Sequence, residues 1–117
     1  MAEKKPITRA FLKLTKGYRE LRKSILDSLN ARGLVELQFR DLAEQYMDCW
    51  CDVQLATAEI DEKGVTILDE RRGTPMANPA CAVKRNAVST MAQLFSKLGF
   101  DQQARQADAG AEDDDEL

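Results

Sequence analysis

One apolar repeat in the middle of the chain limits the folds open to it. Between Phe39 and Ile60, apolar residues recur at alternating steps of three and four. This spacing places them on one side of a continuous helix that ends at Lys63-Gly64 and spans roughly 36 Å. The chain has 117 residues and few other segments long enough to cover such a helix. We therefore predict a helical bundle around one long central helix. The repeat consists of Phe39, Leu42, Tyr46, Cys49, Val53, Ala56 and Ile60, and it is flanked by Ala43, Met47, Trp50 and Leu55.

Shorter helices are expected on both sides of the central one. Residues 18–30 combine an apolar stripe with a basic outer face, and Gly33 follows them as a helix terminator. The link to the central helix is short, so these two helices should be antiparallel neighbours. Asn78-Pro79 is typical of a helix N-cap followed by a first-turn proline, which predicts a third helix up to Gly99.

The segment between the second and third of these helices has the pattern of strands. Residues 65–68 are rich in β-branched side chains, residues 69–73 favour a turn, and residues 74–76 can return as an edge strand. A lone two-stranded hairpin is marginally stable in water. We therefore expect it to lean on the helices or on another subunit.

These elements predict an all-α fold: an antiparallel helical bundle with one long central helix and a short β-hairpin. About 100 residues bury only some 60–70% of their unfolded surface, which favours oligomerisation. We expect a basic flexible arm at 1–16 and a helical oligomerisation core at 17–107 with the hairpin near 65–76. The core includes a short polar helix from Asp101, and a disordered acidic tail follows at 108–117.

Charge is arranged in blocks along the chain. Residues 1–40 have ten Lys or Arg and four Asp or Glu, a net charge of +6, whereas residues 41–70 have one and nine, a net charge of −8. Residues 71–100 have a net charge of +5, and residues 101–117 have a net charge of −6. Blocks of opposite sign predict separate basic and acidic faces with separate partners.

The sequence offers little chemistry for catalysis. It has no histidine and no glycine-rich phosphate loop, and its three cysteines do not form a disulfide framework or a metal site. The acidic residues of the central helix lie opposite the apolar repeat, so we expect them to face water or a basic face of another subunit. These residues are Asp41, Glu44, Asp48, Asp52 and Glu59. We predict a cytosolic protein that is not an enzyme, holds no metal or other cofactor and does not enter a membrane.

Several stretches taken together resemble a known family. Residues 22–29, 39–67 and 73–79, followed by the helix with Met91, Leu94, Leu98 and Gly99, are similar in order and spacing to the small terminase subunits of tailed bacteriophages. The resemblance covers about residues 17–105. It implies a ring-forming protein in the cytoplasm of the infected bacterium that has no catalysis of its own. Such a protein recognises double-stranded viral DNA for packaging and regulates the large terminase subunit, an ATPase and nuclease.

The resemblance and the charge blocks together suggest roles for particular residues. DNA phosphates should be bound by Lys4, Lys5, Arg9, Lys13, Lys16, Arg19, Arg22 and Lys23. The oligomer and its core should involve Phe39, Leu42, Tyr46, Trp50, Val53 and Ile60. A second basic set, expected at a subunit interface or on DNA, is Arg71, Arg72, Lys84 and Arg85. Docking on the large subunit is expected from Glu112, Asp113, Asp114, Asp115 and Glu116. The same acidic tail could instead mimic DNA and restrain the basic arm, or serve only solubility.

Two other functions fit the same residues. A small dimeric transcriptional regulator or antitoxin-like protein would use the basic arm on a palindromic DNA site. A coiled-coil scaffold without nucleic acid would leave that arm solvated. The ring predicts many subunits, the regulator predicts a dimer, and the scaffold predicts no salt-dependent binding of DNA.

Overall fold

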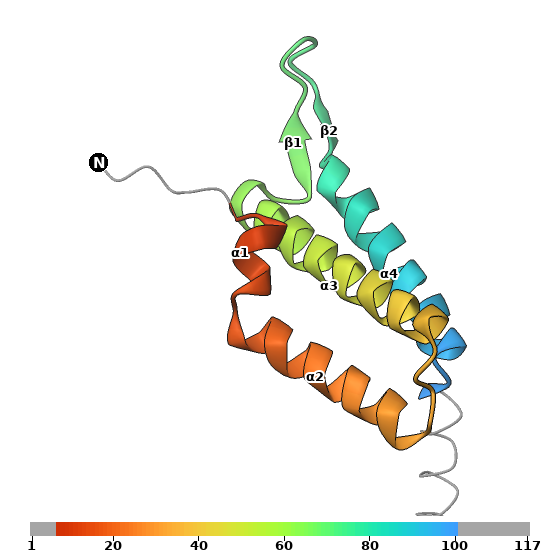
Figure 1. Ribbon diagram of the computed structural model, residues 1–117. Coiled ribbons are helices and arrows are strands. Elements are labelled where there is room, and N and C mark those ends of the chain that lie inside the picture. Colours follow the sequence, from red (N-terminus) through yellow and green to blue (C-terminus); the bar gives the residue numbers. More distant parts are fainter. Residues whose placement is uncertain (1–6, 101–117) are drawn as a thin grey trace, which may run out of the picture.

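The predicted helical bundle with a small hairpin is confirmed by a computed structural model, which describes residues 7–100 (Figure 1). Along the chain the elements are α1 (Arg9–Lys13), α2 (Lys16–Ala31), α3 (Leu37–Lys63), β1 (Thr66–Leu68), β2 (Pro75–Ala77) and α4 (Pro79–Lys97). The long helix α3 lies between its neighbours, with α1 and α2 on one side and α4 beside it in the opposite direction (Figure 1). As expected from the short link, α2 and α3 are antiparallel neighbours.

The core lies where α1 and α2 meet the first half of α3. Its α3 residues are Ala43, Met47 and Cys51, each at most 1% exposed, and they follow one another at steps of four. The prediction had placed these positions beside the apolar seam or outside it. Small side chains at Ala43 and Cys51 let neighbouring helices approach closely, so burial is deepest there. Of the predicted oligomer and core residues, Phe39, Leu42, Tyr46 and Trp50 pack half-buried against this cluster, whereas Val53 and Ile60 are half-buried outside it.

The N-terminal segment differs from the flexible arm that was expected up to residue 16. Residues 9–13 form α1, whose Leu12 is buried in the core. The hydroxyl oxygen of Thr8 accepts a hydrogen bond from the backbone N–H of Phe11 and begins this helix. Thr15 caps α2 in the same way through the N–H of Tyr18, so α2 starts two residues before the predicted position. Lys4 and Lys5 lie outside the described residues.

The hairpin projects beyond the helices (Figure 1). Its antiparallel strands pair Thr66 with Ala77 and Leu68 with Pro75, and the turn is closed by a 2.7 Å bond from the Gly73 N–H to the Asp69 carbonyl oxygen. All of β2 and both end residues of β1 are exposed. Within the described chain the hairpin therefore does not lean on the helices along its length.

Asn78 fixes the base of the hairpin to both long helices. The side-chain amide of Asn78 donates to the carbonyl oxygen of Gly64 at 2.9 Å, and the amide oxygen accepts from the N–H of Ala80 at 3.0 Å. The backbone N–H of Asn78 donates to the carbonyl oxygen of Val65 at 2.8 Å. This confirms the predicted N-cap and joins the end of α3 to the start of α4.

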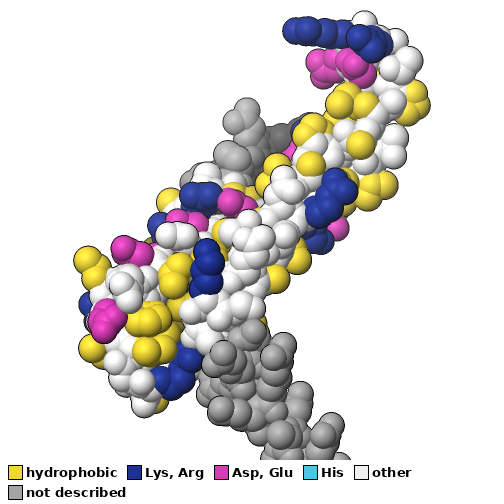
Figure 2. Space-filling view, turned by 90° about the vertical axis from the view of Figure 1, so that its right-hand side faces the viewer, with side chains coloured by type: hydrophobic (Ala, Val, Ile, Leu, Met, Phe, Trp, Pro, Cys, Tyr) yellow, Lys and Arg dark blue, Asp and Glu magenta, His cyan; other side chains and the backbone are white. Residues whose placement is uncertain are grey.

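The chain is elongated and leaves much apolar surface open. Its radius of gyration is 18.8 Å, compared with about 13 Å for a compact domain of about 100 residues. Figure 2 shows hydrophobic side chains spread over the α4 side and up the hairpin, with basic side chains among them. Val83 and Val88 on α4 are each 49% exposed, and Leu68 on the hairpin is 65% exposed. Within residues 7–100, no helix combines the length and apolar character needed to cross a bilayer.

Candidate nucleic-acid interface

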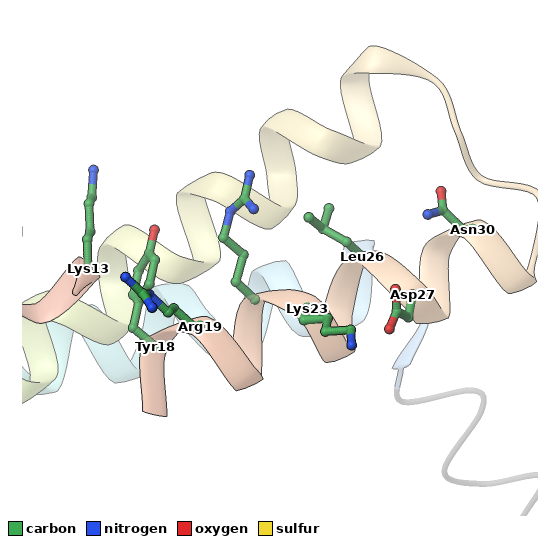
Figure 3. A pocket seen from close by; sticks show the side chains of 8 residues that line it. Lys13, Tyr18, Arg19, Lys23, Leu26, Asp27 and Asn30 are labelled. Carbon is green, nitrogen blue, oxygen red and sulfur yellow. The ribbon is translucent and has the colours of Figure 1, made fainter. Parts of the chain in front are cut away.

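A groove with basic walls runs along the outer side of α2 (Figure 3). It has a volume of about 500 Å³ and is open to solvent. We call it the basic groove, and it is lined by Lys13, Tyr18, Arg19, Arg22, Lys23, Leu26, Asp27 and Asn30. Lys13 comes from the end of α1, and the other residues come from successive turns of α2 (Figure 3).

The helical repeat of α2 explains how these residues come together. Arg19, Lys23, Leu26 and Asn30 follow at steps of three and four, which places them on one face of the helix. The neighbouring face is fixed in the core through Ile25 and Leu29, which are 5% and 1% exposed. Burial of that stripe sets the rotation of α2 and thereby holds the basic side chains outward.

Ion pairs within the chain divide the basic residues into two groups. Arg22 binds Glu44 of α3 at 2.7 Å, and Lys16 binds Glu20 at 3.7 Å. Lys13, Arg19 and Lys23 are exposed and form no ion pair with any residue of the described chain. These three side chains are therefore the cations that the basic groove presents to an outside anion.

Arg9 has its partner on the central helix. Its Nη2 donates to both carboxylate oxygens of Asp52, at 2.8 and 2.9 Å, and its Nε donates to one of them at 3.1 Å. These hydrogen bonds raise the pKa of the Arg9 guanidinium. Of the residues predicted to bind DNA, Arg9 is thus already engaged by its own chain.

The acidic face of α3 also finds partners within its own chain. Glu44 and Asp52 were expected to meet water or a second subunit, but they bind Arg22 and Arg9 of the same chain. A sequence divided into charge blocks does not reveal whether the blocks meet within one chain or between two. Here the first basic block folds onto part of the acidic one.

The second basic set is split between two places. Arg71 and Arg72 are exposed in the turn between β1 and β2, and Lys84 and Arg85 lie near the start of α4. None of the four forms an ion pair within residues 7–100.

Sequence reasoning missed the uncharged wall of the basic groove. Tyr18, Leu26 and Asn30 line it beside the cations, whereas the site predicted from the sequence contains only Lys and Arg. The tilted ring contact of Tyr18 with Trp50, at 5.9 Å between centroids, helps to hold that wall against α3. The sequence feature that could have predicted this wall is the spacing of three and four residues from Arg19 to Asn30, which places these side chains on one face of the helix.

The reactive side chains of the described residues are not arranged for chemistry. Burial raises the pKa of the Cys49 and Cys51 thiols, which disfavours the nucleophilic thiolate. No three Cys, Asp or Glu side chains between residues 7 and 100 are grouped so that they could hold a metal ion. What the arrangement does bring together is a set of exposed basic side chains along the basic groove.

Comparison with known families decides the class of the protein. A family model described as "phage terminase, small subunit" matches residues 19–115. The chain belongs to this family. The match covers α2 from Arg19 onward, with Arg19 and Lys23 of the basic groove but not Lys13, and it confirms the resemblance found in the sequence. Searches of curated proteins and of solved structures find no match to the chain.

Membership gives the small subunit a broad role in phage DNA packaging, together with the terminase large subunit. The family acts in the cytoplasm of the infected host, and its members are generally non-catalytic.

Proposed function

We propose that this small terminase subunit is a non-catalytic, ring-forming protein that binds double-stranded viral DNA through the basic groove and recruits the large subunit. The observation that supports DNA binding is the set of three exposed, unpaired cations on the outer face of α1 and α2. Lys13, Arg19 and Lys23 stand on a surface fixed by the core beneath it.

The chemistry of the groove suits DNA phosphates. Lys and Arg side chains bind phosphate by charge and hydrogen bonding, and each contact releases counterions from the duplex. Arg22 is a weaker candidate because Glu44 already neutralises it at 2.7 Å. Lys4 and Lys5 stay predicted DNA ligands outside the described residues. We thus assign the phosphate contacts of the described chain chiefly to Lys13, Arg19 and Lys23.

The salt dependence of DNA binding tests this assignment. In the triple variant K13A/R19A/K23A, the affinity for a duplex of mixed sequence should fall. The plot of log affinity against log salt concentration should become less steep by about 0.9 for each lost contact. Fluorescence anisotropy with labelled duplex, repeated at several salt concentrations, measures both quantities.

A matched control removes three cations elsewhere. The variant R71A/R72A/R85A has the same change in net charge but leaves the basic groove intact, so its salt dependence should stay close to that of the unchanged protein. An equal loss of slope in both variants would contradict the assignment to the groove. A less steep salt dependence in the control variant alone would indicate that the DNA site lies on the hairpin and α4.

Ring formation is supported by the apolar surface that one chain leaves uncovered. Val83, Val88 and Phe95 on α4, with Leu68 and Met76 on the hairpin, are at least 37% exposed. Several exposed large apolar side chains on a small, elongated chain are typical of surfaces that another chain covers. A second copy would also cover the edges of the hairpin.

Recruitment of the large subunit is assigned to the acidic run at 112–116, which lies outside the described residues. Five consecutive acidic residues form a compact anionic segment that a basic surface of a partner can bind. Measuring whether the large subunit binds protein in which these residues are replaced by Asn and Gln tests this part of the proposal.

A further inference from the structure

We infer that the acidic run at 112–116 also has a binding site on its own chain: in the absence of DNA it occupies the basic groove and competes with DNA phosphates. This inference concerns regulation of the DNA site and so rests on the function proposed above. The contact itself can be observed without DNA.

The first argument is charge complementarity. The basic groove presents Lys13, Arg19 and Lys23, which form no ion pair within residues 7–100, and the one carboxylate that lines it, Asp27, forms none there either. Glu44 and Asp52 are held by Arg22 and Arg9. The run at 112–116 supplies five carboxylates in sequence. It is therefore the densest source of negative charge in the chain and resembles a strand of phosphates in its charge pattern.

The second argument is the place where the described chain ends. The ring of Phe100 lies 4.9 Å from the guanidinium carbon of Arg32, which is the C-cap residue of α2. The chain thus leaves the described region near the C-terminal end of α2, on the side of Ser24 and Ser28, and Asn30 lines the basic groove on the other side of the same end. Residue 112 follows twelve residues later, a reach of up to about 40 Å. Since α2 has 16 residues and is about 24 Å long, the acidic run can reach Arg19 and Lys23 on α2, and its later residues extend toward Lys13 on α1.

The third argument is the shape of the site. The groove is open and about 500 Å³ in volume, which admits an extended peptide with its side chains. Leu26 and Tyr18 offer apolar contact along the wall, and Asn30 offers a hydrogen-bonding amide at the end nearest Phe100. The acidic run and a DNA strand would use the same three cations, so they exclude each other.

Lysine reactivity tests the contact directly in the full-length protein without DNA. Lys13 and Lys23 should be acetylated faster in the variant D113N/D114N/D115N/E116Q than in the unchanged protein. Amine acetylation followed by mass spectrometry measures both rates. Lys84 on α4 should be modified at an unchanged rate. The matched control is D41N/D61N/E62Q/E70Q, which loses four exposed carboxylates elsewhere and should leave the rates at Lys13 and Lys23 unchanged.

The affinity for duplex DNA is a second measurement that tests the inference. At low salt the tail variant should bind duplex DNA about tenfold more tightly than the unchanged protein, as expected from the loss of about three exposed ion pairs. The difference should vanish at high salt because exposed ionic contacts are screened.

The outcomes separate the two proposals. Faster modification of Lys13 and Lys23 without any DNA binding would support the internal contact and reject the proposed DNA site. Unchanged lysine rates would overturn the internal contact, whether or not DNA binds. Equal gains in DNA affinity in both four-residue variants, with unchanged lysine rates, would assign the gain to reduced general repulsion and would also overturn it.

Discussion

A single buried amide joins three elements of the fold. Asn78 is 3% exposed and hydrogen-bonds to Gly64, Val65 and Ala80, at the end of α3, beside the hairpin and at the start of α4. Loss of an N-cap side chain costs about 0.5–2 kcal/mol, and an unsatisfied buried carbonyl adds about 1 kcal/mol. We expect Asn78→Ala to lower the free energy of unfolding by about 2 kcal/mol, as measured by urea denaturation followed by circular dichroism.

Two further substitutions separate the contributions at this position. Asn78→Ser keeps a hydroxyl oxygen that can cap the first turn of α4 but loses the donor to the Gly64 carbonyl, so its effect should be smaller than that of Asn78→Ala. Asn86→Ala changes an exposed asparagine on the same helix and should stay within about 0.5 kcal/mol of the unchanged protein. Equal losses for Asn78→Ala and Asn86→Ala would show that the junction does not depend on this amide.

At the scale of elements, α1 is held to α3 by one buried side chain and one ion pair. Leu12 enters the core, and Arg9 binds Asp52 on the surface. An exposed ion pair contributes at most about 1 kcal/mol, so Asp52→Asn should increase the open population of α1 severalfold without unfolding the bundle. Trypsin cleavage after Lys13 should accelerate by the same factor, because cleavage follows the open population when opening is fast.

The control for α1 is Glu59→Gln, which breaks a pair with Lys63 at 2.8 Å on the same helix but away from α1. It should leave cleavage after Lys13 unchanged. Higher salt should accelerate cleavage in the unchanged protein and have little further effect in Asp52→Asn. Cleavage that is insensitive to both salt and Asp52→Asn would mean that Leu12 alone holds α1.

The elements that could be predicted from sequence are those whose signals are local. The cap at Asn78, the glycine turn at Gly73 and the continuous helix α3 each depend on neighbouring residues, and each appears as predicted, although the deepest burial on α3 lies beside the predicted repeat, at Ala43 and Met47. The docking of α1 has no such signal. Phe11, Leu12 and Leu14 are similar in sequence, yet only Leu12 is buried while Phe11 and Leu14 are 56% and 70% exposed.

The candidate site shows the same division between local and long-range information. The spacing of Arg19 and Lys23 already indicated a basic face on α2. Which cations stay free depends on Glu44 and Asp52, which are 22 and 43 residues away from their partners. Such pairings follow from how α1, α2 and α3 pack, and no periodicity in the sequence encodes them.

For the whole molecule, assembly should depend on the exposed apolar side chains of α4, which flank its buried stripe. We expect V83D/V88D to keep its helical content, since both side chains are 49% exposed in the single chain. Its mass by light scattering after size exclusion should fall from that of a ring toward 13.1 kDa, because two carboxylates would be buried without partners at a subunit interface. Substitutions at Tyr46 would be less informative, since that side chain packs against the core of its own chain.

The control for assembly is S89D/Q93D, which adds the same two charges to exposed polar positions of α4. It should retain the mass of the unchanged protein at moderate and high salt. If V83D/V88D also retains that mass, neither Val83 nor Val88 lies in the interface. A dimer for the unchanged protein would instead favour a regulator-like architecture.

The long helix α3 passes through two different surroundings. Its first half contributes Ala43, Met47 and Cys51 to the core, whereas Ala56 is the last fully buried residue before the helix ends at Lys63. In a free subunit, backbone amides near Met47 should exchange with deuterium slowly and those in the last two turns should exchange faster. Contact between subunits would slow amide exchange only in the last two turns of α3. One continuous helix would thus report the stability of the subunit at one end and the lifetime of the assembly at the other.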